Sequence, residues 1–259
     1  MENSFIKTYK SDTICFICLA RPEKKNALSQ QMVTELTNAF LNAEKDKQIR
    51  IIILKANGDA FCSGADLESL IKIRELSFEQ NLDDSKQMSD LLNAIYRSSK
   101  ITIAIIEGPA IAGGCGLVSA CDFAFATPQS RFGYPEVRIG FVPAVVAFFL
   151  IKKIGETRAK ELLLTGEIIL AEKALKFGLI NEILDQQEIH LYAEEFANRM
   201  SNETSLNSIS MTKELISKFS GKTLDEIATL SVQTNAKSRM TDDFKKGITA
   251  FLNKEKIKW

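Results

Sequence analysis

Apolar and polar residues alternate with two different periods along the first half of the chain. Runs of apolar and β-branched residues predict strands, at 13–19, 51–54, 101–106 and 123–126. Between them, apolar residues recur every three or four positions in 29–47 and 78–96, which predicts amphipathic helices. Because strands alternate with helices, we expect an α/β fold with largely parallel strand pairing.

The pattern changes after about Pro143, where helical periodicity begins to dominate. The segments with this periodicity are 144–154, 156–164, 171–177 and 187 to the end, with a turn and short strand in 178–183. No low-complexity linker separates the two halves. We therefore expect a core in residues 1–200 and a C-terminal helical region in residues 201–259, packed together as one functional unit.

Charge and cysteine content narrow the possible partners and location. Lys plus Arg number 33 and Asp plus Glu number 33, so no global field attracts nucleic acid or an anionic membrane. The N-terminus lacks the basic and apolar regions of a signal peptide, and no apolar run approaches the roughly 20 residues that span a bilayer. The five cysteines are odd in number, which indicates free thiols in a reducing cytosol and predicts a cytoplasmic protein.

Several stretches resemble common binding or catalytic motifs but lack a residue or a geometry that the motif requires. Ser220–Thr223 resembles the end of a phosphate-binding loop, but the leading glycine is missing. Cys15 and Cys18 have CxxC spacing, yet strand alternation puts their side chains on opposite faces, so we expect buried core thiols. The single histidine, His190, lies at the polar start of a predicted helix, where we expect a solvated side chain. Ser–His and Cys–His catalysis are therefore disfavoured, and no residue cluster has metal-site spacing.

Three separated segments point to a single site. Phe61–Leu67 follows a predicted strand and leads into a helix, whose first N–H groups are unpaired. The glycine-rich stretch Gly108–Asp122 lies at a second strand-to-helix junction, where bare backbone lets a ligand approach. One N–H group from each segment, converging on one point, would form an oxyanion hole. Phe132–Gly140 adds Glu136, whose apolar surroundings would raise its pKa and suit it to acid/base work.

Each segment also has a simpler structural interpretation. Glycine clusters alone are more typical of tight helix–strand packing than of catalysis. Glu136 alone is more often solvated or paired, and Arg131 and Arg138 lie close to it in sequence. Asp66 is best interpreted as the N-cap of the helix that follows it. The combination of the three segments is what favours a catalytic site.

Taken in order, these segments and their flanks resemble the crotonase superfamily of enoyl-CoA hydratases and isomerases. The stretches that carry the resemblance are Arg21–Leu28, Phe61–Leu67, Gly108–Asp122, Phe132–Pro143, Gly155–Gly166 and Gly247–Phe251. The resemblance implies a spiral of repeated ββα units with a C-terminal helical region that builds a homotrimer or hexamer. It also implies an acyl-CoA thioester substrate, in fatty-acid or branched-chain acyl-CoA metabolism, with coenzyme A as part of the substrate, no separate cofactor and no metal. Delivery of the acyl group on a carrier protein stays open, because coenzyme A and a carrier protein present the same pantetheine arm.

The resemblance also assigns catalytic roles to individual residues. It places the oxyanion hole at the backbone N–H groups of Ala65 and Gly113 and makes Glu136 the acid/base. Removing or adding a proton beside a thioester puts negative charge on its oxygen, which two preorganised donors would stabilise as an enolate.

Further residues match substrate-binding positions of the family. Lys24 and Lys25 match the loop that contacts the CoA nucleotide. Phe251 and Lys254 match positions that reach the CoA of a neighbouring subunit in some members. The remaining substrate contacts that the resemblance implies are Ser63, Asp66, Leu67 and Pro135.

Two departures from the hydratase pattern leave the reaction open. Hydratases of this family carry a first glutamate two residues after the paired glycines, and Gly116 occupies that position here. Hydration would then depend on Glu136 alone, whereas a 3-enoyl to 2-enoyl isomerase needs only one base. Pro143–Ala147 stands where many hydratases have a glycine-rich turn, so we expect a bulkier and drier wall there. Tyr134–Pro143, however, looks like a bacterial branch of enoyl-CoA or methylglutaconyl-CoA hydratases, so hydration and isomerisation both stay open.

Two other functions agree less well with the sequence. Some methylglutaconyl-CoA hydratases bind RNA through a lysine-rich first helix, but acidic residues outnumber the two lysines of the matching helix 29–47. A non-catalytic acyl-CoA-binding protein is disfavoured because a carboxylate such as Glu136 is costly to bury without a purpose. The helix 78–96 and the loop before it are expected to shape the acyl pocket, around Leu67, Leu70, Ile71 and Leu76.

Overall fold

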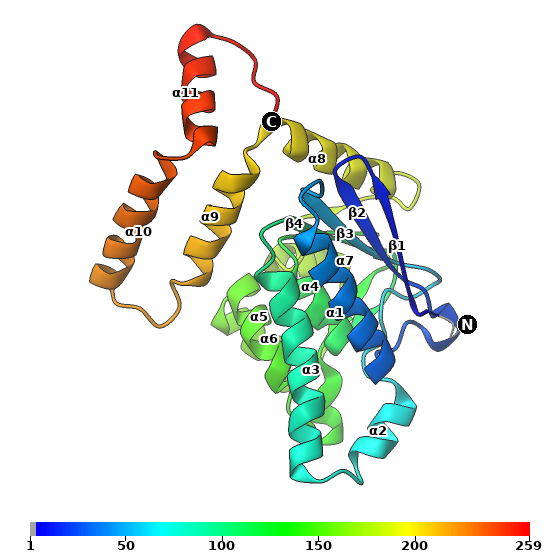
Figure 1. Cartoon of the computed structure of the whole chain (residues 1–259). Coiled ribbons are helices and arrows are strands. Elements are labelled where there is room, and N and C mark those ends of the chain that lie inside the picture. Colours follow the sequence, from blue (N-terminus) through cyan, green and yellow to red (C-terminus); the bar gives the residue numbers. More distant parts are fainter. Residues whose placement is uncertain (1–3) are drawn as a thin grey trace.

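A computed structural model describes residues 4–259 and contains a six-stranded, mostly parallel sheet (Figure 1). Its strands are β1 (Ile6–Ser11), β2 (Ile14–Leu19), β3 (Ile51–Ala56), β4 (Ile101–Ile106), β6 (Phe123–Ala126) and β9 (Glu182–Ile183). They lie in the order β1-β2-β3-β4-β6-β9. β1 is antiparallel to β2, and every other neighbouring pair is parallel. The predicted α/β fold with largely parallel pairing is therefore confirmed.

A second sheet has three strands, β5 (Ala110–Ile111), β7 (Arg131–Gly133) and β8 (Ile168–Leu170). They lie in the order β5-β7-β8, with β5 parallel to β7 and β7 antiparallel to β8. Two isolated parallel bridges, Leu28 with Ala65 and Cys62 with Ala110, pair further segments nearer the N-terminus. After each of β2, β3, β4 and β6, the chain thus adds a short pairing segment and then a helix. This repetition produces the expected spiral of ββα units.

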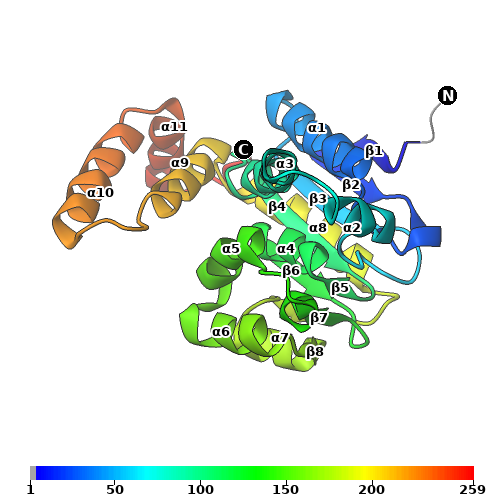
Figure 2. The same cartoon turned by 90° about the horizontal axis from the view of Figure 1, so that it is seen from below.

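Helices cover both faces of the larger sheet (Figure 2). Those of the core are α1 (Gln30–Lys45), α2 (Leu67–Ile73), α3 (Phe78–Tyr96), α4 (Gly113–Ala120), α5 (Ala144–Ile154), α6 (Glu156–Thr165), α7 (Ala171–Phe177) and α8 (Ile189–Glu203), with the short 3-10 helices η1 (Pro22–Lys24) and η2 (Pro135–Ile139). Ile14 and Phe16 of β2 pack in the cluster that contains α8. Cys15 and Ile17 pack in the cluster that contains α1, α3 and α4. The alternation of side chains along each strand thus creates two core layers.

The C-terminal helices project away from this core (Figure 1). They are α9 (Leu206–Ser217), α10 (Leu224–Ser238) and α11 (Asp242–Asn253). α9 and α10 bury none of their residues, and large apolar side chains of this region are exposed, among them Leu224, Val232, Met240 and Phe251. Lys213 of α9 ties the region to the core, because its Nζ donates to Asp122 Oδ2 at 2.5 Å and to the Lys100 carbonyl at 2.6 Å. The division of the chain at residue 200 stays a prediction.

Most of the predicted helices and strands are confirmed, several of them with the expected bounds. α3, α5 and α7 begin and end where the periodicity places them, and the side chains of Ser29 and Asp66 cap α1 and α2. The sequence did not predict β1, in which only Ile6 is buried, or the short strands β5, β7 and β8. Such strands are too polar or too short to produce a periodic pattern.

The stretches that only resemble binding or catalytic motifs have ordinary structural roles. All five cysteines are buried and free, with Cys15 and Cys18 on opposite faces of β2 as expected. Thr223 caps α10 and Gly221 lies in the turn before it, so this stretch is a helix start and not a phosphate-binding loop. Within residues 4–259, no helix is long and apolar enough to cross a membrane.

One buried amide fixes the loop that leads into α1. Asn26 is fully buried, although its φ of 52° lies in the left-handed region. Its Nδ2 donates to the carbonyls of Asn57 at 2.9 Å and Ala60 at 2.8 Å. Its Oδ1 accepts the N–H of Arg21 at 2.9 Å. The amide therefore ties this loop to the segment that follows β3.

Replacing Asn26 with alanine should lower the free energy of unfolding by roughly 3 kcal/mol, since two carbonyls and one N–H lose their partner in the core. Urea unfolding measures the change. Asn42→Ala, on the exposed side of α1, is the matched control and should change the free energy by less than about 0.5 kcal/mol. An effect of Asn26→Ala as small as that of the control would show that the amide does not hold the loop.

Candidate active site

Main-chain hydrogen bonds hold three short segments side by side. The N–H of Leu28 donates to the Gly64 carbonyl at 2.7 Å, and the N–H of Asp66 donates to the Leu28 carbonyl at 3.0 Å. In the same way, Cys62 bonds to the chain around Ala110, through the Pro109 carbonyl at 3.1 Å and the Ile111 N–H at 2.9 Å. The segment 62–66 is therefore paired on one side with residue 28 and on the other with 109–111.

The pairing of these segments leads to one cavity that both predicted oxyanion donors line. Cys62 pairs with Ala110, and Ala65 and Gly113 each follow three residues further along their own segment. The groups that bond Leu28 belong to the neighbours of Ala65, so the N–H of Ala65 itself points away from Leu28. Gly113 is the first residue of α4, and its N–H has no acceptor within the helix. Both residues line one cavity, so the structure brings the two predicted donors together.

Backbone strain marks the point where the two donor segments touch. Ala112 has a φ of 53°, which a residue with a side chain rarely adopts, and Gly64 has a φ of 94°. A Cβ added to Gly64 would lie 3.0 Å from the Ala112 Cβ and 3.2 Å from the Ile111 carbonyl oxygen. The two segments are thus in contact at the residues immediately before Ala65 and Gly113. Strained backbone of this kind costs on the order of 1–3 kcal/mol and is typical of functional sites.

The glycines of the cluster have different structural roles. A Cβ on Gly113 would meet only the flexible ends of Leu28, at 3.0 Å, and Met88, at 3.3 Å. A Cβ on Gly114 would lie 2.4 Å from the Cys62 carbonyl oxygen, where backbone cannot yield. Gly113 therefore leaves space beside a donor in the cavity, whereas Gly114 allows α4 to pack closely against the neighbouring segment.

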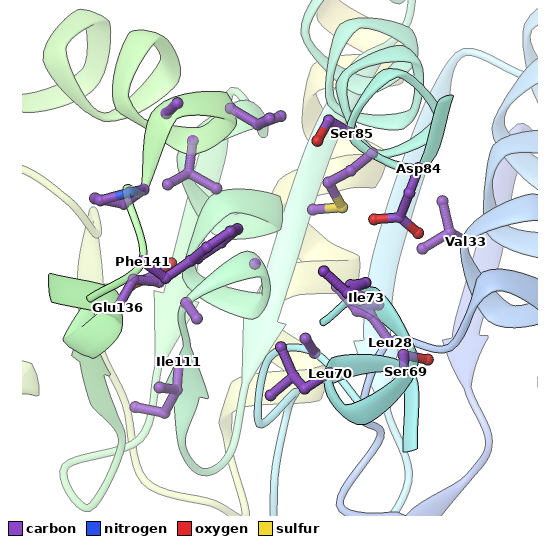
Figure 3. A pocket seen from close by; sticks show the side chains of 18 of the residues that line it. Leu28, Val33, Ser69, Leu70, Ile73, Asp84, Ser85, Ile111, Glu136 and Phe141 are labelled. Carbon is purple, nitrogen blue, oxygen red and sulfur yellow. The ribbon is translucent and has the colours of Figure 1, made fainter. Parts of the chain in front are cut away.

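The cavity has a volume of about 360 Å³ and mostly apolar walls (Figure 3). Its apolar lining includes Leu28, Val33, Leu70, Ile73, Met88, Ile111, Ile139, Phe141, Val142, Val145 and Val146. Among the residues expected to shape the acyl pocket, Leu70 lines this cavity and Leu76 lines an adjoining one. The expectation is wrong for Leu67 and Ile71, whose side chains are 71% and 58% exposed and line neither cavity. They lie on the side of α2 that faces away from the cavities.

Glu136 lies in the cavity wall without a polar partner. It is in the first turn of η2, immediately after Pro135, and is only 9% exposed. Its Oε2 is buried and has no hydrogen-bond partner among residues 4–259, and neither Arg131 nor Arg138 forms an ion pair with it. Burial raises the pKa of the Glu136 carboxyl above its ordinary value. The simpler interpretation, a paired or solvated side chain, is therefore wrong for this glutamate.

Val146 fills the space beside Gly116, the position at which hydratases of the family carry their first glutamate. A Cβ on Gly116 would lie 2.6 Å from Val146 Cγ1 and 3.6 Å from Leu92 Cδ1. Val146 belongs to α5, within the stretch that was expected to form a bulkier wall. A side chain at residue 116 would thus collide with α5. Among the described residues, the other acidic residue in the cavity wall is Asp84, on α3, across the cavity from Glu136 (Figure 3).

The predicted CoA-contacting residues lie close to the three paired segments. Lys24 Nζ is 3.3 Å from Glu68 Oε1, and the Lys25 carbonyl accepts the N–H of Ser63 at 3.1 Å. Ser63 and Pro135 both line the cavity. The Asp66 carboxylate caps α2 and pairs with Arg21 at 2.5 Å, so it is already occupied by protein groups.

Other predicted residues lie away from the cavity. Phe251 and Lys254 are at the end of α11, and Figure 1 places α11 far from α2 and the lower half of α3. This chain alone therefore does not bring them to its own cavity. His190 is partly exposed, and its Nε2 lies 2.9 Å from Glu107 Oε2, so the expected free, solvated ring is instead paired. None of Phe251, Lys254 and His190 lines the cavity, and no group of residues 4–259 has the composition of a metal site.

Several residues of the cavity were not predicted from the sequence. They are Ser69, Ile73 and Phe141. Asp84 and Met88 lie in the helix that was expected to shape the acyl pocket, and Val146 lies in the stretch that was expected to form a bulkier wall. Asp84 and Met88 are four residues apart on α3, which is the spacing of one helix face, so periodicity could have placed them together. Nothing in the sequence indicates that this face meets Gly113.

The fold and the site define a crotonase-type enzyme, and comparison with known proteins agrees. Residues 9–259 match the Enoyl-CoA hydratase/isomerase family, so the chain belongs to this family. It is an enzyme of the hydratase/isomerase class and acts in acyl-CoA metabolism.

Individual relatives resemble the chain over almost its whole length. A Thermus thermophilus protein provisionally named an enoyl-CoA hydratase is 38% identical over 244 residues, covering 93% of this chain and 95% of that protein. The trans-2-decenoyl-acyl-carrier-protein isomerase of Streptococcus mutans is 28% identical over 251 residues, covering 95% and 94%. The crystal structure of an enoyl-CoA hydratase from Shewanella pealeana has a TM-score of 0.93 at 28% identity, covering 98% of this chain and 96% of that chain.

Glu136 should make the stability of the protein depend on pH. Its pKa is raised in the folded state, so between the ordinary value of 4.5 and the folded value the folded protein binds more protons than the unfolded chain. Stability from this group is thus present at acid pH and is lost as pH rises through that window. Glu136→Gln cannot ionise, so it should gain stability relative to the wild type as pH rises from below 4.5 to neutrality.

Urea unfolding of both proteins at a series of pH values measures this gain. Glu172→Gln, at an exposed position on α7, is the control and should show no such trend. A constant difference between Glu136→Gln and the wild type at all pH values would contradict a buried carboxyl without a partner.

Proposed function

We propose that this enzyme moves the double bond of an enoyl thioester from the 3-position to the 2-position, with Glu136 as its single acid/base. One observation carries the proposal. The Glu136 carboxyl has no protein partner, while Val146 occupies the space that a second carboxylate at residue 116 would need. An allylic shift needs only one group that removes and returns a proton.

In the proposed reaction the thioester oxygen accepts hydrogen bonds from the N–H groups of Ala65 and Gly113. The Glu136 carboxylate removes a proton from C2 of a 3-enoyl thioester, and the electron pair moves into the carbonyl to form a dienolate. The two donors stabilise the charge that develops on the oxygen. Protonated Glu136 then returns the proton to C4, and the double bond forms between C2 and C3 as the carboxylate is regenerated. A raised pKa makes this carboxylate the stronger base.

Hydration of a 2-enoyl thioester is the second candidate, because relatives of the chain are named hydratases. Glu136 would then activate water for attack at C3 and afterwards protonate C2, with the same two N–H donors on the oxygen. This reaction asks one carboxyl to handle a water molecule and a carbon in turn. The filled position beside Gly116 is the reason for placing hydration second.

We further propose how the substrate is held. The acyl thioester is delivered on coenzyme A, with Lys24 and Lys25 near the nucleotide and no separate cofactor or metal. The enzyme is a homotrimer or hexamer, in which Phe251 and Lys254 contact the CoA bound to a neighbouring subunit. It is located in the cytoplasm. The exposed apolar side chains of α10 and α11 support such self-association, since they have no cover in the single chain. Zero net charge offers no support for RNA as a partner.

Glu136→Gln should lower kcat/KM for 3-hexenoyl-CoA by roughly 10²- to 10⁴-fold, because the amide cannot take a proton from C2. The gain of conjugated absorbance follows isomerisation, and the loss of absorbance from crotonyl-CoA follows hydration. The wild type should convert 3-hexenoyl-CoA much faster than it hydrates crotonyl-CoA. The exposed Glu172→Gln variant should keep both rates. Faster hydration than isomerisation by the wild type would favour the second candidate, and full activity of Glu136→Gln would rule out both.

Gly113→Val should abolish turnover while the protein stays folded. The new side chain would meet flexible side-chain ends and would fill the space beside the donor, and loss of one such donor typically costs about 10²- to 10³-fold in kcat. Gly114→Ala is the contrasting variant and should lose about 1–3 kcal/mol of unfolding free energy, because its Cβ meets the Cys62 carbonyl. Activity assays and urea unfolding separate the two effects. Near-normal turnover by Gly113→Val would contradict the oxyanion assignment.

A further inference from the structure

The cavity contains a second carboxylate that the proposed reaction does not use. Asp84 is partly buried on α3 and lines the cavity across from Glu136 (Figure 3). Its side chain forms no hydrogen bond or ion pair with any residue in 4–259. Burial raises its pKa, and no neighbouring cation offsets this effect. The fold therefore gains no visible stabilisation from Asp84.

The contacts of α3 locate Asp84 relative to the oxyanion hole. Leu92 of α3 lies against Gly116, and Met88, one turn earlier, lies against Gly113. α3 thus runs alongside α4, with Met88 level with the first residue of α4. Asp84 lies one further turn back, about 6 Å along the helix axis from Met88, and so beyond the N-terminus of α4. A ligand group that contacts Asp84 is therefore separated from a thioester oxygen bound at Gly113 by at least one turn of α3.

A second cavity begins at Asp84. It has a volume of about 590 Å³, lies between α1, α2 and α3, and contains none of Ala65, Gly113 and Glu136. The residues that line both cavities are Ser29, Gln30, Ser69, Ile73, Asp84 and Gln87. Five of these six are polar, in contrast to the apolar walls around Glu136. The boundary between the cavities is therefore a polar site within reach of an apolar chamber.

We infer that Asp84 is a specificity-determining residue that accepts a hydrogen bond from a donor group carried on the distal part of the acyl chain. Because the carboxylate has no protein partner, a plain alkyl chain would bury it further without a hydrogen bond, which is unfavourable. A hydroxyl or ammonium group would supply the missing donor through a charge-assisted bond. The inference relies on the proposed function only in placing the thioester at Ala65 and Gly113.

Binding of unreactive ligands tests this inference separately from the reaction. The ligands are hexanoyl-, octanoyl- and decanoyl-CoA, each as the plain chain, with a terminal hydroxyl and with a terminal ammonium group. Dissociation constants are measured by calorimetry for the wild type, Asp84→Leu and Asp84→Asn. Asp90→Leu is the matched control, because Asp90 lies on the same helix and lines neither cavity.

The wild type should bind at least one donor-bearing chain about tenfold more tightly than the plain chain of equal length. Asp84→Leu should reduce this preference to within about twofold and bind the plain chain more tightly, whereas Asp90→Leu should keep the wild-type preference. Asp84→Asn distinguishes the two donors, since its amide oxygen still accepts from a hydroxyl but no longer pairs with a cation.

Two results would overturn the inference. One is equal or tighter binding of the plain chain by the wild type at every length. The other is a donor preference that survives in Asp84→Leu. Either result leaves the proposed isomerisation untouched, because plain 3-hexenoyl-CoA tests that reaction independently. Failure of all acyl-CoA ligands to bind the wild type would instead contradict the proposed substrate class.

Discussion

Everything proposed for this enzyme depends on main-chain pairing that aligns the segments around Leu28, Ala65 and Gly113. The bonds from Cys62 to the chain around Ala110 align two segments whose following residues, Ala65 and Gly113, line one cavity. The buried amide of Asn26 and the contact between Gly64 and Ala112 hold these segments in place. Since the proposed donors are backbone groups, substitutions can displace or obstruct them but cannot delete them. The spiral fold is what brings such donors together from distant parts of the chain.

Opposite walls of the cavity each carry one carboxylate, and the two carboxylates have different surroundings. On one side, burial raises the pKa of Glu136, and Val146 closes the neighbouring position, so one carboxyl faces the thioester site. On the other side, Asp84 lies at a polar boundary with a second cavity. The two carboxylates are therefore suited to different tasks, proton transfer near the thioester and recognition at a distance from it. The proposed separation of roles would account for two acidic residues in a largely apolar cavity.

The sequence predicted much of the fold and the centre of the site, for identifiable reasons. Long apolar runs and helical periodicity predicted β3, β4, α3 and α5, and the resemblance to a family predicted Ala65, Gly113 and Glu136 as a group. Strands such as β5 and β7 were missed because they form only through pairing between distant segments. For the same reason nothing local to residue 116 showed that Val146 fills its space, and Asp84 read as an ordinary polar position on an amphipathic helix. Contacts between elements distant in sequence decide all of these features.

The most direct test of the central claim is the carbonyl stretching frequency of a bound thioester. Octanoyl-CoA labelled with ¹³C at the carbonyl is unreactive, and infrared difference spectra can isolate its carbonyl band in the complex. If the N–H groups of Ala65 and Gly113 both donate to the oxygen, the carbonyl is polarised and its band should move to lower frequency than in water. Gly113→Val should lose that shift even where the ligand still binds. A bound carbonyl at the frequency found in water, or higher, would contradict the oxyanion hole and with it the proposed chemistry.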